Sequence, residues 1–114
     1  MNVAIVGATG YGGIQAVNLL KDNKNYKISY LGGNKSSGSK WNDNFPFIYL
    51  DSDLFIEKIS VENITKCADI ALLCLPNGIS SSLTRGLLEK GVKVIDLSAD
   101  YRYKSLDEWK SVYI

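Results

Sequence analysis

Three glycines at three-residue spacing follow a short apolar run near the start of the chain. The run, residues 3–6, is β-branched at three of its four positions, which predicts a strand buried on both faces of a parallel sheet. Gly7 then allows a tight turn, Gly10 lets backbone approach a ligand, and Gly13 lets the next helix pack closely. Amides at that helix N-terminus would face a phosphate. The pattern predicts a dinucleotide's pyrophosphate site, and the alternative is a plain strand–turn–helix connection.

The residues after the second expected strand bear on the choice of dinucleotide. An NAD site usually places an acid here, roughly 20 residues past the glycines, to hold the ribose 2′-OH. No Asp or Glu occurs between Asp22 and Asp43, and the loop instead offers Lys35, Ser36 and Ser37. A cation and hydroxyls suit a 2′-phosphate, so the sequence predicts NADP rather than NAD. The alternative is a flexible solvated loop without a ligand.

The chain offers few residues for catalysis or for metal binding. The chain has no histidine, which excludes Ser–His–Asp and Cys–His catalysis and histidine metal sites within these residues. We expect Cys67 and Cys74 to pack in the core, because a catalytic thiol needs a partly exposed, electropositive setting. Asp51 and Asp53 are expected in an exposed turn. Asp96, after the last expected strand, is expected to brace the following turn together with residue 100.

Composition limits the class of protein. The chain has 114 residues, which favours one domain, and its net charge of +1 gives no electrostatic footprint for nucleic acid or an anionic membrane. It is 46% hydrophobic, enough for one core, yet no apolar run approaches a membrane span. The N-terminus lacks the features of a signal peptide. The expected compartment is the cytoplasm.

The elements that position these residues alternate along the chain. Apolar periodicity predicts helices over residues 11–21, 60–67, 79–90 and 106–112, and strands over residues 3–6, 26–31, 54–59, 70–75 and 92–97. Residues 36–46 are expected to be irregular, and the aromatic residues Phe45, Phe47, Tyr49 and Phe55 to pack at the edge of the core. This alternation predicts an α/β, Rossmann-like, doubly wound, mostly parallel sheet with helices on both faces.

Three segments together resemble the N-acetyl-gamma-glutamyl-phosphate reductase family of arginine biosynthesis. They are GATGYGG at residues 7–13, LPNG at residues 75–78, and DLSADYRYKSLDEW at residues 96–109. The family has loops of the type GASGYTG, LPHG and DLSADFRL. The third segment is the most specific. Asn77 stands where the family has histidine, and asparagine cannot change charge near neutral pH.

The resemblance implies that this chain is the NADP-binding part of a two-domain oxidoreductase. It implies that a cysteine beyond the DLSADFR segment attacks an acyl phosphate, that NADPH reduces the thioester to a semialdehyde, and that a histidine is the acid–base. Neither residue is present here, so no catalytic residue is expected within residues 1–114, and the full-length enzyme is expected to be a homo-oligomer. The implied cofactor-binding residues are Gly7, Thr9, Gly10, Tyr11, Gly12, Lys35, Ser36, Ser37, Leu75, Pro76, Asn77 and Ser98.

Two alternatives remain open. One is a related semialdehyde-forming reductase of lysine biosynthesis, which shares these motifs. The other is a stand-alone, non-catalytic dinucleotide sensor, in which the absence of the nucleophile and the histidine is functional. The coding sequence after residue 114 would distinguish them.

Overall fold

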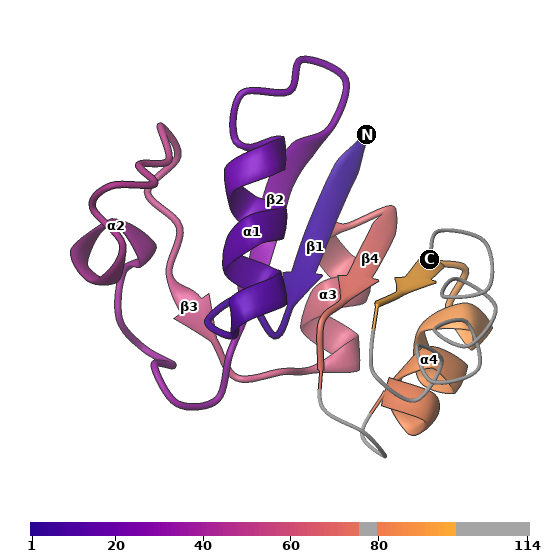
Figure 1. The fold of residues 1–114 in the computed structure, drawn as a ribbon. Helices are drawn as coiled ribbons and strands as arrows, with labels where there is room; N and C mark the ends of the chain where they lie inside the picture. Colours follow the sequence, from indigo (N-terminus) through magenta and orange to yellow (C-terminus); the bar gives the residue numbers. More distant parts are fainter. Residues whose placement is uncertain (76–79, 98–114) are drawn as a thin grey trace, which may run out of the picture.

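A computed structural model describes residues 1–75 and 80–97 and shows a five-stranded sheet in which every neighbouring pair is parallel (Figure 1). The strand order is β3-β2-β1-β4-β5. The strands are β1 (Asn2–Val6), β2 (Lys27–Gly32), β3 (Ile56–Glu57), β4 (Ile70–Leu73) and β5 (Lys93–Asp96). The order reverses at β1, as it does in a doubly wound sheet. The predicted fold class is confirmed.

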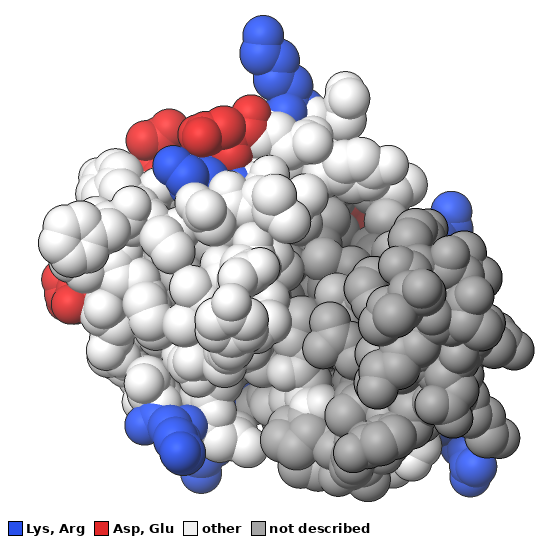
Figure 2. Space-filling model, viewed as in Figure 1, with Lys and Arg blue, Asp and Glu red and all other residues white. Residues whose placement is uncertain are grey.

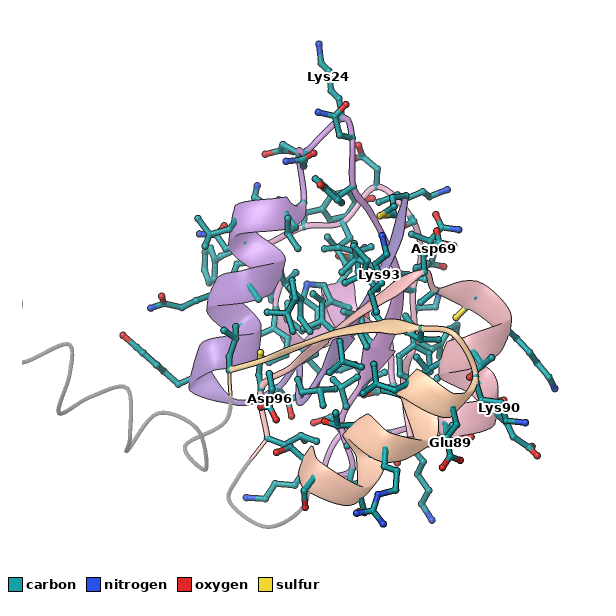
Figure 3. All side chains as sticks on the ribbon, turned by 90° about the vertical axis from the view of Figure 1, so that its right-hand side faces the viewer. Lys24, Asp69, Glu89, Lys90, Lys93 and Asp96 are labelled. Atoms are coloured by element: carbon teal, nitrogen blue, oxygen red, sulfur yellow. The ribbon has the colours of Figure 1, made fainter. Side chains whose placement is uncertain are left out.

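Helices lie on both faces of the sheet. They are α1 (Tyr11–Leu20), α2 (Trp41–Asn44), α3 (Val61–Cys67) and α4 (Ser80–Glu89). With the sheet turned almost edge-on, α1 lies on one side and both α3 and α4 lie on the other (Figure 3). Each face has its own apolar core, because alternate residues of β1 point to opposite sides. Ile5 packs with Val17 of α1, whereas Val6 packs with Ile64 of α3 and Leu87 of α4.

Local signals in the sequence account for several of these boundaries. Ser60 precedes α3 as predicted, and its Oγ accepts a hydrogen bond from the Asn63 amide at 3.3 Å. Gly91 follows α4 with φ +83°, a left-handed conformation that ends the helix. The Val92 amide then donates to the Leu87 carbonyl at 3.0 Å, which turns the chain into β5.

The region between β2 and β3 differs from the prediction. Residues 36–46 are not wholly irregular, because they contain the short helix α2. Trp41 at its start is fully buried, donates through Nε1 to the Ile48 carbonyl at 2.7 Å and stacks on Phe45 at 4.2 Å between centroids. The packing expected of Phe47, Tyr49 and Phe55 is wrong, since their exposed fractions are 98%, 60% and 48%, whereas Phe45 packs at the core as expected.

Two strands are shorter or less buried than expected. Residues 54–59 give only the two-residue β3 at the sheet edge. The β4 strand ends at Leu73, so Cys74 and Leu75 lie beyond it, and Leu72 is half-buried rather than buried. Among the described residues, no helix combines the length and apolar character needed to cross a bilayer. The predictions for Pro76, Asn77, Ser98, Asp100 and a helix over residues 106–112 fall outside the described residues.

Candidate dinucleotide site

The turn after β1 accepts only glycine at two of its positions. Gly7 has φ +84°, and a Cβ there would stand 2.3 Å from the Cys74 carbonyl oxygen. A Cβ on Gly13 would stand 2.0 Å from the Gly7 carbonyl oxygen and 2.6 Å from the Ala8 Cα. The first turn of α1 therefore rests directly on the backbone of the loop. This is the close packing that the glycine spacing predicts.

The N-terminus of α1 presents uncapped backbone at the carboxyl edge of the sheet. Gly10 is the N-cap residue and provides no side-chain hydrogen bond, and the first turn holds no acidic residue. Gly10 and Gly12 are exposed, and a Cβ on either would meet no atom closer than 3.6 Å or 3.9 Å, respectively. Free amides and the positive end of the helix dipole together favour an anion. The loop therefore fits a diphosphate group.

The end of β2 is tied to the same turn. The Gly32 carbonyl accepts hydrogen bonds from the amides of Gly7 at 2.8 Å and Ala8 at 2.9 Å. The Gly33 amide donates to the Glu57 carbonyl at 2.9 Å, which holds residue 33 between the glycine turn and β3. A Cβ on buried Gly33 would lie 3.1 Å from Thr9 Oγ1. The end of β2 and the glycine turn therefore form one continuous surface.

The residues after Gly33 form an ordered turn rather than a loose loop. The Ser37 hydroxyl donates to the Asn34 carbonyl at 3.3 Å, and the Ser39 hydroxyl donates to the Ser36 carbonyl at 2.7 Å. Lys35 is exposed, while Ser36 and Ser37 are half-buried. The predicted cation and hydroxyls thus follow directly from the carboxyl end of β2, at the edge that carries the glycine turn.

A cavity of about 680 Å³ runs along α1, from Gly10 to Leu20, beside β4 and the residues that follow β4 and β5. Its volume falls within the range typical of small-molecule sites. The described residues that line it are mostly apolar. They are Gly10, Tyr11, Gly12, Gln15, Ala16, Leu19, Leu20, Leu72, Cys74, Leu75 and Leu97. Cys74, expected in the core, is half-buried and packs against the α1-side core while facing this cavity.

Glu57 of β3, which pairs with Gly32 at the end of β2, is directed to the opposite face of the sheet from Ile56. Burial raises the pKa values of Tyr30 and Cys67, and the Glu57 carboxylate adds to both shifts. Tyr30 belongs to the core under α3 and α4, whereas Gly33 faces Thr9 on the other side. On the face seen in Figure 2, the charged side chains lie at the margin and the broad middle is uncharged among the described residues.

The predicted site residues fall into two groups at one edge of the sheet, the lower edge in Figure 1. Gly10, Tyr11, Gly12 and Leu75 line the cavity on the β4 side. The other group, on the β2 side, comprises Gly7, Thr9, Lys35, Ser36 and Ser37. Sequence reasoning missed Gly33, whose contact with Thr9 becomes visible only in three dimensions. The ligand-binding roles of all these residues stay predictions, and the described residues include no cluster of metal-ligating side chains.

Proteins of similar sequence are N-acetyl-gamma-glutamyl-phosphate reductases. The protein from Prochlorococcus marinus (strain MIT 9312) is 85% identical over 113 residues, which is 99% of this chain and 32% of the relative. The protein from Prochlorococcus marinus (strain MIT 9211) is 52% identical over 112 residues, which is 98% of this chain and 31% of the relative. The chain thus spans about a third of the length of the curated relatives that it matches.

Solved structures share the fold at lower identity. Aspartate semialdehyde dehydrogenase with NADP from Candida albicans has a TM-score of 0.73 and 21% identity, covering 89% of this chain and 30% of that one. Aspartate semialdehyde dehydrogenase II from Vibrio cholerae, complexed with ASA, has a TM-score of 0.64 and 25% identity, and the match covers 90% of this chain and 32% of that one. A nicotinamide dinucleotide is the ligand class of such a domain. Matched over residues 2–114, the chain belongs to the family described as the NAD binding domain of semialdehyde dehydrogenase.

Proposed function

We propose that this chain is the NADP-binding domain of an N-acetyl-gamma-glutamyl-phosphate reductase, which reduces N-acetylglutamyl phosphate to the semialdehyde. High identity to reductases of that name over almost the whole chain supports the choice of substrate. The observation that carries the binding role is the uncapped N-terminus of α1, seated on the glycine turn. Its amides would hold the diphosphate of the coenzyme. The proposed compartment is the cytoplasm, and self-association of the full-length protein is part of the proposal.

The end of β2 favours NADP over NAD in this proposal. Gly32, Gly33 and Asn34 offer no carboxylate for the ribose hydroxyls, and the Glu57 carboxylate acts on the opposite face. Lys35 supplies a positive charge beside the hydroxyls of Ser36 and Ser37. A phosphate accepts charge-assisted hydrogen bonds from such groups, whereas an acid in this position would repel it. Together these residues would bind the 2′-phosphate.

The contribution of this chain to the reaction is to bind and orient the coenzyme, which supplies the hydride when bound. The cavity beside Leu75 and Leu97 gives an apolar wall against which the coenzyme would lie. The Cys67 thiol donates to the Asn63 carbonyl at 3.2 Å, and burial raises its pKa, which disfavours the thiolate that a nucleophile needs. The chain contains no histidine. Cys74, which lines the cavity, does not match the place of the family's nucleophile, so in this proposal the nucleophile and the acid–base come from the rest of the full-length protein.

Titration calorimetry with NADP and NAD tests the binding role directly. We expect tighter binding of NADP, and we expect Lys35→Ala to weaken NADP binding about tenfold or more, because a charge-assisted hydrogen bond worth about 1.5 kcal/mol is lost, while NAD binding stays unchanged. Lys24→Ala is the matched control, since Lys24 lies at the opposite end of the sheet (Figure 3). Equal affinities for the two coenzymes, or equal effects of the two substitutions, would refute the choice of NADP.

The choice of reaction needs the protein at its full encoded length. We expect NADPH oxidation with N-acetylglutamyl phosphate and none with the carrier-linked acyl phosphate of lysine biosynthesis or with aspartyl phosphate. Activity on the lysine-pathway substrate alone would identify the related reductase. Coenzyme binding without any reduction, by a protein that encodes no further domain, would identify the dinucleotide sensor.

A further inference from the structure

We propose that Thr9 and Gly33 act as a pair that selects the 2′-phosphorylated coenzyme, Thr9 occupying the position where an NAD-specific sheet places its acidic side chain. This inference rests on the proposed function and adds a specificity determinant to it. The two residues come from different elements, the turn after β1 and the end of β2, and meet at the carboxyl edge of the sheet.

The first step of the argument is the place of residue 33. It lies roughly 20 residues past the last glycine of the loop, which is the position of the ribose-binding acid in NAD-specific sheets. The Gly33 amide is bonded to the Glu57 carbonyl at 2.9 Å, and the preceding carbonyl of Gly32 is bonded to the Gly7 and Ala8 amides. Backbone hydrogen bonds therefore hold residue 33 in place on both sides, and its side-chain direction is set by the fold.

The second step is what lies in that direction. A Cβ on Gly33 would stand 3.1 Å from Thr9 Oγ1 and 3.2 Å from Thr9 Cγ2, and 3.3 Å from Ile56 Cγ2. Ile56 is fully buried at the sheet edge and has little room to move. Thr9 is half-buried in the turn and can be displaced. Even a methyl group at residue 33 must therefore displace the Thr9 side chain slightly, and a larger side chain must displace it further.

The third step is the electrostatic consequence. With Thr9 over Gly33, this corner carries a neutral hydroxyl, the exposed Lys35 follows Gly33 by two residues, and the Glu57 carboxylate lies on the opposite face of the sheet. An acid at residue 33 would accept hydrogen bonds from two ribose hydroxyls but would repel a phosphate. The Thr9 side chain and an acidic side chain at residue 33 compete for the same space. The pair therefore disfavours an acidic side chain at residue 33 and leaves the carboxyl end of β2 open to a 2′-phosphate.

A double-mutant cycle on coenzyme affinity tests the pair. We expect Gly33→Asp alone to weaken NADP and NAD alike, because the new side chain collides with Thr9. In the Thr9→Ala background, which removes the two Thr9 atoms nearest to residue 33, Gly33→Asp should shift the affinity ratio toward NAD by at least about tenfold. Gly33→Asn in that background is the matched control, of almost equal volume but uncharged, and should shift the ratio less than about twofold.

A second cycle needs no coenzyme and covers variants that bind poorly. Gly33→Ala should lower the melting temperature more when Thr9 is present than in the Thr9→Ala background, where the contact with Ile56 is the close one that remains. An equal fall in melting temperature in the two backgrounds would show that residue 33 does not contact Thr9. The role of the pair in coenzyme selection would be refuted by either of two results. The ratio of NADP to NAD affinity could shift as far in Gly33→Asp alone as in the double variant, or it could shift in neither variant. Equal binding of NADP and NAD by the unchanged protein refutes the proposed function itself, so the two failures are distinguishable.

Discussion

Replacing Gly13 by alanine adds one methyl group at the point where α1 rests on the turn. The added Cβ would stand 2.0 Å from the Gly7 carbonyl oxygen and 2.6 Å from the Ala8 Cα, more than an ångström short of ordinary contact with the first atom. Both obstacles are backbone atoms, so no side chain can rotate to make room. The helix must move away from the sheet, and Ala16 and Val17 must leave their packed positions.

The magnitude follows from two opposing effects. Alanine is the better helix former by about 1 kcal/mol. Inserting a methyl group into a closely packed site costs about 1–3 kcal/mol and sometimes more, and backbone obstacles place this case at the upper end. We expect a net loss of about 2 kcal/mol in the free energy of unfolding, which lowers the melting temperature by about 10 °C at this chain length.

Thermal denaturation followed by circular dichroism measures this loss, with Gly12→Ala as the matched control. A Cβ on Gly12 would meet no atom closer than 3.9 Å, so this neighbouring substitution should leave the melting temperature unchanged or raise it. NADP binding by Gly13→Ala should also be lost, since its helix N-terminus has moved from the turn. If Gly13→Ala melts within about 2 °C of the unchanged protein, a shift worth well under 1 kcal/mol, the close packing of α1 on the loop is wrong.

Two further substitutions test the core and the tyrosine beneath α3. Trp41→Ala should cost about 3–5 kcal/mol in urea denaturation because it empties a fully buried site, whereas Phe47→Ala, at a ring that is 98% exposed, should change stability by less than about 0.5 kcal/mol; similar losses would contradict the placement of Trp41. Burial raises the pKa of Tyr30 above 10.0, so the free energy of unfolding should fall as pH rises from 10.0 through the raised value, because the unfolded chain releases its proton first. Tyr30→Phe should remove that part of the pH dependence, and an unchanged slope would refute the shift.

The sequence was sufficient for the repeating elements and for the glycine turn. Apolar runs and helical spacing predicted β1, α1, β4 and α4 within a few residues of their observed bounds, because each buries one face against the sheet. Gly7 and Gly13 were assigned conformational roles that the structure confirms, since a left-handed φ and a backbone contact both exclude a side chain. Ser60 and Gly91 marked helix ends through local hydrogen bonds. All these signals lie within a few residues of the feature that they predict.

The features that the sequence did not predict depend on contacts between residues far apart in the chain. The α2 helix is four residues long and shows no periodicity, and Trp41 is held by the carbonyls of Ile48 and Leu54. Phe47 and Trp41 look alike as isolated aromatic residues, yet one is exposed and the other buried. The contact between Thr9 and Gly33 likewise joins two turns that only the parallel pairing of β1 and β2 brings together.

The Gly32 carbonyl accepts hydrogen bonds from two amides of the glycine turn, and it therefore fixes the position of that turn relative to the end of β2. In the proposed complex the diphosphate and the ribose substituent would lie on either side of this carbonyl, which ties the two turns together through the main chain. Side chains such as Lys35 would then mainly alter how strongly each part of the coenzyme is held. We expect single substitutions here to change affinity for a ligand more than the spacing of the charged groups that the site accepts.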